Sequence, residues 1–256
     1  MRQAFAHIDA GTTDLADTVG FNPAGAYACP QRLARESALL FRRYPLLMGL
    51  SNQILQPGDH FTDDLSGIPI LMVRGKVGRA RAFHSVCWHR GARVAEGCGR
   101  QDNFVCPYHG WTYGLEGELR GTPDQRNFPG VDRAAYGLAP PPLAERHGLL
   151  WVRPSVGPQG LEIDAQGFLG ELDAEFASFG LSAYQHYETR QIRRQMNWKL
   201  VIDTFLKSYH FSVLHRDSVA TLFHPNLCLF KPFGPHLREA LPRRSLESQH
   251  SLHDSE

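Results

Sequence analysis

Two cysteines and two histidines are the side chains in this sequence whose types and spacing best suit metal chemistry. Cys87 and His89 are separated by one residue, Cys106 and His109 by two, and sixteen residues lie between His89 and Cys106. Thiolates and imidazoles are ligands that proteins offer to zinc and to iron–sulfur clusters. Each pair lies in a short stretch, so the spacing predicts one metal centre held by two loops.

Two kinds of metal centre fit these four ligands. In a Rieske [2Fe-2S] centre, two cysteines hold one iron and two histidines hold the other, and the neutral imidazoles make the cluster easier to reduce. A structural zinc site is the alternative, but zinc fingers pair like with like, whereas each half here mixes the two types. We therefore favour the iron–sulfur centre. Gly91 and Gly110 closely follow the histidines, and we expect them to let backbone N–H groups approach the sulfurs.

The two ligand segments also resemble a known family. CWHRGA (residues 87–92) and CPYHGWTY (residues 106–113) resemble the Rieske domain of the large subunits of aromatic-ring-hydroxylating oxygenases. The Rieske proteins of respiratory complexes carry one more cysteine in each loop, and these two cysteines form a disulfide. Here Cys98 is the only further cysteine between the ligands, so such a disulfide is not expected.

A second group of histidines lies in residues 197–217, where the apolar spacing predicts a helix with a buried stripe. On a straight helix His210 and His215 point about 140° apart, which is too far for both to bind one metal. From spacing alone, two unrelated histidines are the favoured interpretation. A π-bulge or a helix break between them would bring both rings to one side.

The family resemblance reverses that interpretation. The segment is similar to the mononuclear-iron helix of the same oxygenases, and the matching residues are Asn197, Trp198, Lys199, Asp203, Tyr209, His210 and His215. This resemblance implies non-haem Fe(II) held by His210, His215 and a carboxylate, with O₂ as co-substrate.

Two features of this segment differ from the family pattern. The family has an acid three residues before the first iron histidine, which carries electrons between subunits, and Lys207 stands there instead. We expect Asp203 to pair with Lys207 at helical spacing. The family's third iron ligand lies far downstream, so the resemblance implies a partial large subunit, truncated at its C-terminus.

The predicted fold class is α+β. Residues 1–44 are predicted as a lead-in followed by a helix from Pro30, and residues 45–153 as an antiparallel Rieske β-sandwich. Residues 160–256 are predicted as the first part of a helix-grip (START-like) catalytic domain. Strands are predicted at 69–73, 81–86, 103–106, 149–153 and 184–195 and as a pair within 231–244, and one helix at 164–179.

Composition limits the function classes. The chain has 256 residues with a formal net charge of +1, and no basic run suggests nucleic acid. No apolar run is long enough for a membrane span, and the first twenty residues do not form a signal peptide. Iron–sulfur ligands together with free thiols at Cys29, Cys98 and Cys228 favour the reducing cytoplasm.

The resemblance implies the terminal oxygenase of a Rieske non-haem iron system. Such an enzyme receives NAD(P)H electrons through a reductase, with or without a ferredoxin, and hydroxylates an aromatic or related small molecule. A homotrimer or an α₃β₃ assembly is implied for the full-length form. The alternatives are a Rieske electron carrier or inactive remnant that binds only the cluster, and a zinc-stabilised interaction module.

Overall fold

The structure is a computed structural model that describes residues 2–156, 160 and 162–249. It divides into a larger unit, residues 31–190, and a smaller unit, residues 1–30 with 191–256. The domain boundaries drawn from the sequence stay a prediction, and residues 157–159 in the predicted connection lie outside the described residues. No described helix is both long and apolar enough to cross a membrane.

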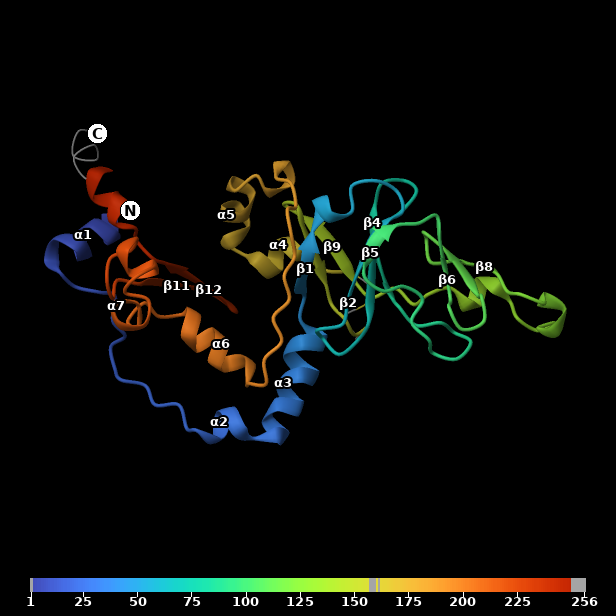
Figure 1. The fold of residues 1–256 in the computed structure, drawn as a ribbon, viewed down its shortest axis with the longest axis horizontal. Coiled ribbons are helices and arrows are strands. Elements are labelled where there is room, and N and C mark those ends of the chain that lie inside the picture. The colour runs from blue at the N-terminus through green and yellow to red at the C-terminus, as the bar shows by residue number, and fades with distance from the viewer. Residues whose placement is uncertain (1, 157–159, 161, 250–256) are drawn as a thin grey trace. The chain divides into compact units, whose positions relative to one another are not determined.

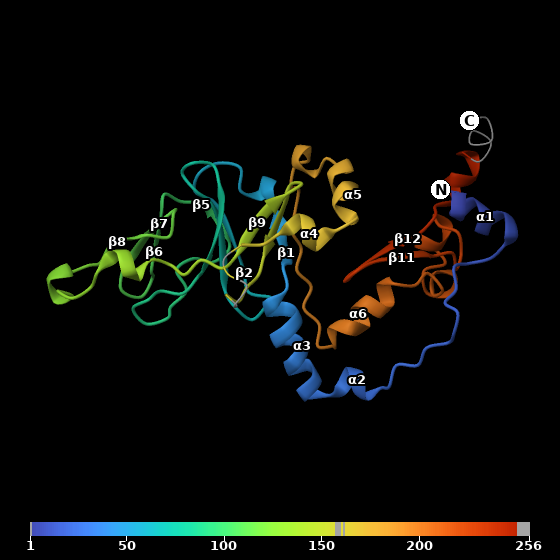
Figure 2. The same cartoon turned by 180° about the vertical axis from the view of Figure 1, so that it is seen from behind.

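The larger unit contains the strands predicted for the β-sandwich (Figure 1). Its strands are β1 (Leu46–Leu50), β2 (Asp59–Asp63), β3 (Ile70–Arg74), β4 (Ala80–His84), β5 (Cys98–Arg100), β6 (Asn103–Val105), β7 (Thr112–Gly114), β8 (Leu119–Gly121), β9 (Leu143–Arg146) and β10 (Leu149–Val152). Its helices are α3 (Pro30–Arg43), α4 (Ala165–Leu169) and α5 (Leu172–Ser178). Three antiparallel sheets result, in the orders β1-β10-β9, β4-β3-β2-β5 and β6-β7-β8. Figure 2 shows the last of these at the end of the unit away from α4.

Strand β3 is the centre of the larger unit because all five of its residues are buried. Successive side chains of a strand point to opposite faces. Ile70 and Met72 pack into one core with Leu150 of β10, whereas Leu71 and Val73 pack into a second core with Cys87, Cys106 and Trp111. The continuous apolar run of this strand therefore reflects two buried faces, and one of them carries the ligand loops.

Most of the predicted elements of the larger unit are confirmed, and two predictions are wrong. The helix predicted at 164–179 is two helices, because Gly170 adopts a left-handed φ of 55° at the end of α4. The strand predicted at 184–195 is absent, since these described residues are exposed and have no partner strand. Alternating residues without a neighbouring strand to receive their hydrogen bonds do not form stable β structure.

The smaller unit joins the two ends of the described chain. Its elements are α1 (Arg2–Ala10), α2 (Gly25–Ala28), α6 (Trp198–Phe205), α7 (Phe211–Leu214), β11 (Leu229–Phe233) and β12 (His236–Ala240). The strand pair predicted within 231–244 is confirmed as the β11–β12 hairpin. The Thr13 hydroxyl accepts from the Cys228 N–H, and the Asp14 carboxylate accepts from the Phe230 N–H at 3.0 Å. The N-terminal lead-in is thus attached to the hairpin.

The buried apolar stripe predicted for α6 and the residues after it is wrong. Val201 is 40% exposed, Phe205 74% and Tyr209 75%. One contact of α6 is made instead at its N-terminus. There the Asn197 side chain caps the helix and donates to the Tyr27 carbonyl. Helical periodicity identified an apolar face, but no described element of the smaller unit covers it.

An ion pair between a buried arginine and a partly exposed glutamate joins the two sheets of the first core. The guanidinium of Arg74 donates to both carboxylate oxygens of Glu145, at 2.8 and 2.9 Å, and also to the backbone carbonyl of Ile54. Only 8% of the Arg74 side chain is exposed. Burial alone would raise the pKa of Glu145, but its bonds with Arg74 are the main reason that the pKa lies below its ordinary value.

We predict that Glu145→Gln lowers the free energy of unfolding by about 1–3 kcal/mol at pH 7. The reason is that the amide is a weaker acceptor than the carboxylate for the buried Arg74 guanidinium. Because the folded pKa is depressed, the stabilisation is complete above the unfolded pKa of about 4.3 and is lost as pH falls below it. Denaturant titrations at several pH values measure this difference. Asp64→Asn, at the exposed Arg93–Asp64 pair, is the control and costs below about 1 kcal/mol. Equal losses in both variants would contradict the prediction.

Candidate functional site

The two ligand loops share one backbone design. The Gly91 N–H donates to the Cys87 carbonyl at 2.9 Å, and the Gly110 N–H donates to the Cys106 carbonyl at the same distance. Both glycines have left-handed φ values, 72° and 70°, which disfavour other residues. The N–H groups of the two glycines thus close the turns. The sequence predicts that these glycines let backbone N–H groups approach the sulfurs, and one such contact is present. A backbone N–H that does reach the Cys87 sulfur belongs to His89.

The cysteines of the two loops lie together in the second core of the larger unit. Cys87 is 1% exposed and Cys106 is 2% exposed. Burial is the main cause that raises the pKa of the Cys87 thiol, and the neighbouring Cys106 adds to it, while the Tyr113 hydroxyl acts in the opposite direction. Two buried thiols side by side can bind one iron of a cluster, since metal binding removes their protons.

The histidines form the second pair. The rings of His89 and His109 have centroids 4.4 Å apart. The Nδ1 atom of His89 is buried and has no hydrogen-bond partner among the described residues. A buried ring nitrogen without a hydrogen-bond partner, beside a second imidazole, fits the role of a metal ligand.

The grouping of these ligands fits an iron–sulfur cluster. The two cysteines belong to one buried core, and the two histidine rings form a pair of their own. A [2Fe-2S] cluster requires two protein ligands for each iron, so a cysteine pair and a histidine pair fit it.

Histidines 210 and 215 lie together in the smaller unit. Helix α6 ends at Phe205, and a new turn, α7, begins after His210 and ends before His215. His215 has φ −115° and ψ 25°, outside the helical range, and the two ring centroids are 5.2 Å apart. The straight-helix argument against a shared metal therefore does not apply. The His210 Nδ1 atom is buried without a partner among the described residues, and the same residues supply no third ligand.

The pairing predicted between Asp203 and Lys207 is wrong. Lys207 lies beyond the end of α6, so the helical spacing is lost, and the described residues show no ion pair between the two. Instead the Tyr27 hydroxyl donates to the Asp203 carboxylate at 2.5 Å. The Asp203 side chain is thus held by the N-terminal lead-in, a contact across 176 residues that local spacing could not reveal.

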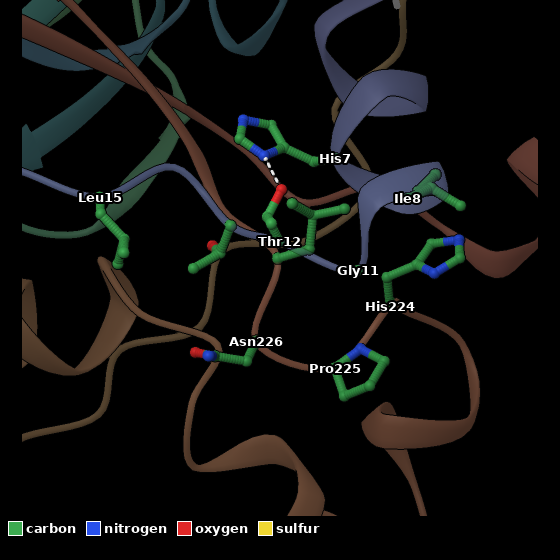
Figure 3. A pocket seen from close by; sticks show the side chains of 10 residues that line it. His7, Ile8, Gly11, Thr12, Leu15, His224, Pro225 and Asn226 are labelled. Carbon is green, nitrogen blue, oxygen red and sulfur yellow. Dashed lines mark hydrogen bonds between the residues drawn. The ribbon is translucent and has the colours of Figure 1, made fainter.

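A separate pocket of about 450 Å³ also lies in the smaller unit (Figure 3). His7, Thr12 and Leu15 line it from the lead-in, and His224 and Asn226 from the loop before β11. The Nδ1 atom of His7 and the hydroxyl of Thr12 are 2.8 Å apart. None of the predicted ligands lines this pocket, so it is not part of the candidate site.

Sequence reasoning missed the side chains that surround the cluster ligands. Tyr113 is fully buried, and its hydroxyl donates to the Cys87 sulfur at 3.4 Å. Phe128 packs edge-on against His89, from a segment for which the sequence predicts no helix or strand. The aromatic residues within 122–148 were the only sequence signal for these contacts, and the neighbouring sequence does not indicate which side chains they pack against.

Comparison with known proteins assigns families to both units. Residues 46–136 match the Rieske [2Fe-2S] domain, and residues 181–254 match the catalytic domain of the ring hydroxylating alpha subunit. The glycine betaine monooxygenase oxygenase subunit of Chromohalobacter salexigens is 34% identical over 78% of this chain and 44% of its own length. The choline monooxygenase of Spinacia oleracea is 30% identical over 76% of this chain and 45% of its own length. The chain thus spans somewhat less than half of these relatives.

Solved structures support the predicted fold class. The crystal structure of the quaternary ammonium Rieske monooxygenase CntA has a TM-score of 0.80 and 21% identity, covering 90% of this chain and 64% of its own. Naphthalene 1,2-dioxygenase from Rhodococcus has a TM-score of 0.68 and 24% identity, covering 88% and 50%. These likenesses concern the fold. The two family matches and the relatives of 30 to 34% identity show that this chain belongs to the alpha (large) subunits of the Rieske-type ring-hydroxylating oxygenases.

Proposed function

We propose that this chain is the terminal oxygenase component of a Rieske non-haem iron system. The observation that carries the proposal is the presence of two separate ligand groups on one chain. Cys87 with Cys106 and His89 with His109 form the first group, and His210 with His215 form the second. An electron carrier needs only the first group, whereas an oxygenase needs a second metal at which O₂ reacts.

The first group would hold a [2Fe-2S] cluster, which supplies one-electron transfer. The second would hold mononuclear Fe(II), which supplies O₂ activation and takes two histidines with one carboxylate in its common form. His210 and His215 provide the imidazoles, and the orphaned Nδ1 of His210 supports this role. The electrons would come from NAD(P)H through a reductase, directly or through a ferredoxin, in the cytoplasm. A trimer of such subunits, with or without a beta subunit, completes the proposal.

We propose a quaternary ammonium compound as the substrate, which is a different class from the aromatic compounds expected from the sequence. The support comes from the names of the relatives, which are glycine betaine, choline and carnitine monooxygenases. Phe205 and Tyr209 are exposed near the histidine pair in the sequence, and aromatic faces attract such cations.

The test combines the purified chain with an NAD(P)H-dependent reductase and follows O₂ consumption and product formation. We expect oxidised product with glycine betaine, choline or carnitine rather than with naphthalene. The matched variant His210→Ala/His215→Ala should keep the visible absorption of the cluster and form no product. A reducible cluster together with a bound mononuclear iron, but without product from any substrate, would contradict the oxygenase proposal. A reducible cluster without a mononuclear iron would favour an electron carrier.

Tyr113 provides a prediction about the cluster itself. Its buried hydroxyl donates to the Cys87 sulfur and accepts from the Trp88 N–H at 3.1 Å. A donor to a ligating sulfur withdraws negative charge, which favours the reduced cluster. We predict that Tyr113→Phe lowers the midpoint potential without loss of the cluster, as measured by an EPR-monitored redox titration. Thr112→Val, at the neighbouring position on β7, is the control, and an equal shift there would exclude a specific role of the hydroxyl.

Lys207 provides a prediction about electron transfer between subunits. An ammonium group is a hydrogen-bond donor only and cannot accept from an imidazole N–H as a carboxylate can. We predict that Lys207→Glu speeds reoxidation of the reduced cluster by O₂ in the presence of substrate, measured in a single turnover. Lys76→Glu, in the β3–β4 turn, makes the same charge change as a control. Identical rates in the parent protein and Lys207→Glu would show that position 207 does not limit the transfer.

A further inference from the structure

The two candidate imidazole ligands of the cluster have different surroundings. The His89 ring is stacked on Trp111, with centroids 5.3 Å apart and an angle of 5° between the planes. Phe128 meets the same ring edge-on, at 5.9 Å and 83°. His89 is therefore held from two directions by aromatic side chains.

These rings belong to a larger group, the aromatic wall, which comprises Trp88, Trp111, Phe128 and Tyr136. Trp111 packs edge-on against Phe128 at 5.7 Å and against Tyr136 at 6.4 Å. Tyr136 in turn packs edge-on against Trp88 at 6.0 Å. Edge-to-face contacts of this kind prefer a defined geometry, so each ring limits the movement of the next.

Phe128 and Tyr136 come from a segment outside both ligand loops, and that segment has its own hydrogen bonds. The Phe128 N–H donates to the Gln125 carbonyl at 2.9 Å. The Asp132 carboxylate accepts from the Ala134 N–H at 3.0 Å, at the start of the short helix that ends with Tyr136. The indole N–H of Trp88 donates to the Gly137 carbonyl. Hydrogen bonds of the backbone and of Asp132 and Trp88 thus hold the aromatic wall in place.

The other imidazole has no comparable cover. His109 is exposed, and the ring that lies closest to it in the described residues is Tyr108, at 3.9 Å between centroids. Tyr108 is itself 59% exposed. The His89 side of the candidate site is therefore partly covered by aromatic rings, whereas the His109 side is open to solvent.

This asymmetry affects the charge that the cluster gains on reduction. The charges of two ferric ions, two sulfides and two thiolates cancel, so with neutral imidazoles the oxidised centre is uncharged and the reduced centre is an anion. Removing water from around a group disfavours its charged form. An apolar cover over the cluster ligands therefore lowers the reduction potential.

We propose that the aromatic wall positions His89 and shields its side of the cluster from water, which holds the reduction potential below the value of an open site. The inference rests on the [2Fe-2S] assignment of the proposed function. Phe128 is the positioning residue best suited to a test, because it is only partly buried, whereas Trp111 is 3% exposed and belongs to the core.

The experiment compares the intact chain with Phe128→Ala, Phe128→Leu and Tyr108→Ala. The midpoint potential at pH 7 and the coupling of solvent deuterium to the cluster are both measured by EPR. Phe128→Ala should raise the potential and increase the deuterium coupling. Phe128→Leu keeps the apolar cover and should stay close to the parent protein. Tyr108→Ala removes an aromatic ring from the open side and should change neither quantity.

Three results would overturn the proposal. They are parent-like values in Phe128→Ala, equal increases in Phe128→Leu and Phe128→Ala, and an increase in Tyr108→Ala as large as that in Phe128→Ala. If Phe128→Ala does not retain a cluster, Phe128→Val takes its place, with the same sign expected and a smaller shift. A parent protein that assembles no iron and acid-labile sulfide contradicts the cluster assignment itself, so the two failures are distinguishable.

Discussion

The closure of two short turns is the constraint on which the candidate cluster site depends. In each turn a glycine with left-handed φ, Gly91 or Gly110, donates its N–H to the carbonyl of the cysteine four residues earlier. This bond sets the direction in which Cys87 and Cys106 leave the backbone, and it turns both side chains into the second core. A side chain in place of either glycine would meet the steric cost of the left-handed region. Ligand spacing alone would not have brought the four side chains together.

The turns can hold their ligands because the structure behind them is rigid. Strand β3 contributes to two cores, so the sheet that carries the first loop is packed on both faces. The Arg74–Glu145 pair links this sheet to the β1-β10-β9 sheet. Around the ligands, the polar contact comes from Tyr113 and the apolar cover from the aromatic wall. A metal site functions through these supporting groups as much as through its ligands, because they set solvent access and the charge on the ligating atoms.

The smaller unit is organised on a different principle. Segments from the two ends of the described chain meet there, and hydrogen bonds to Thr13, Asp14 and Tyr27 hold the lead-in against the hairpin and helix α6. The rings of His210 and His215 lie 5.2 Å apart across the single helical turn α7, and the chain departs from helical geometry at His215. On a straight helix, residues five apart point about 140° away from each other. The departure at His215 therefore matters to the site.

The sequence alone indicated the cluster chemistry and most of the strands of the larger unit. The mixed Cys–His spacing indicated a [2Fe-2S] centre, and the branched residues of 69–73 and 149–153 indicated strands, because these signals are local. Only the tertiary structure decided which side chains surround the ligands. Phe128, Tyr136 and Tyr27 act across long sequence separations, and no periodicity reports such contacts. The same limit explains the wrong predictions. The apolar stripe of α6 and the strand at 184–195 each needed a packing partner that the fold does not supply among the described residues. The Asp203–Lys207 pair needed a helix that continues to Lys207, and Asp203 contacts Tyr27 instead.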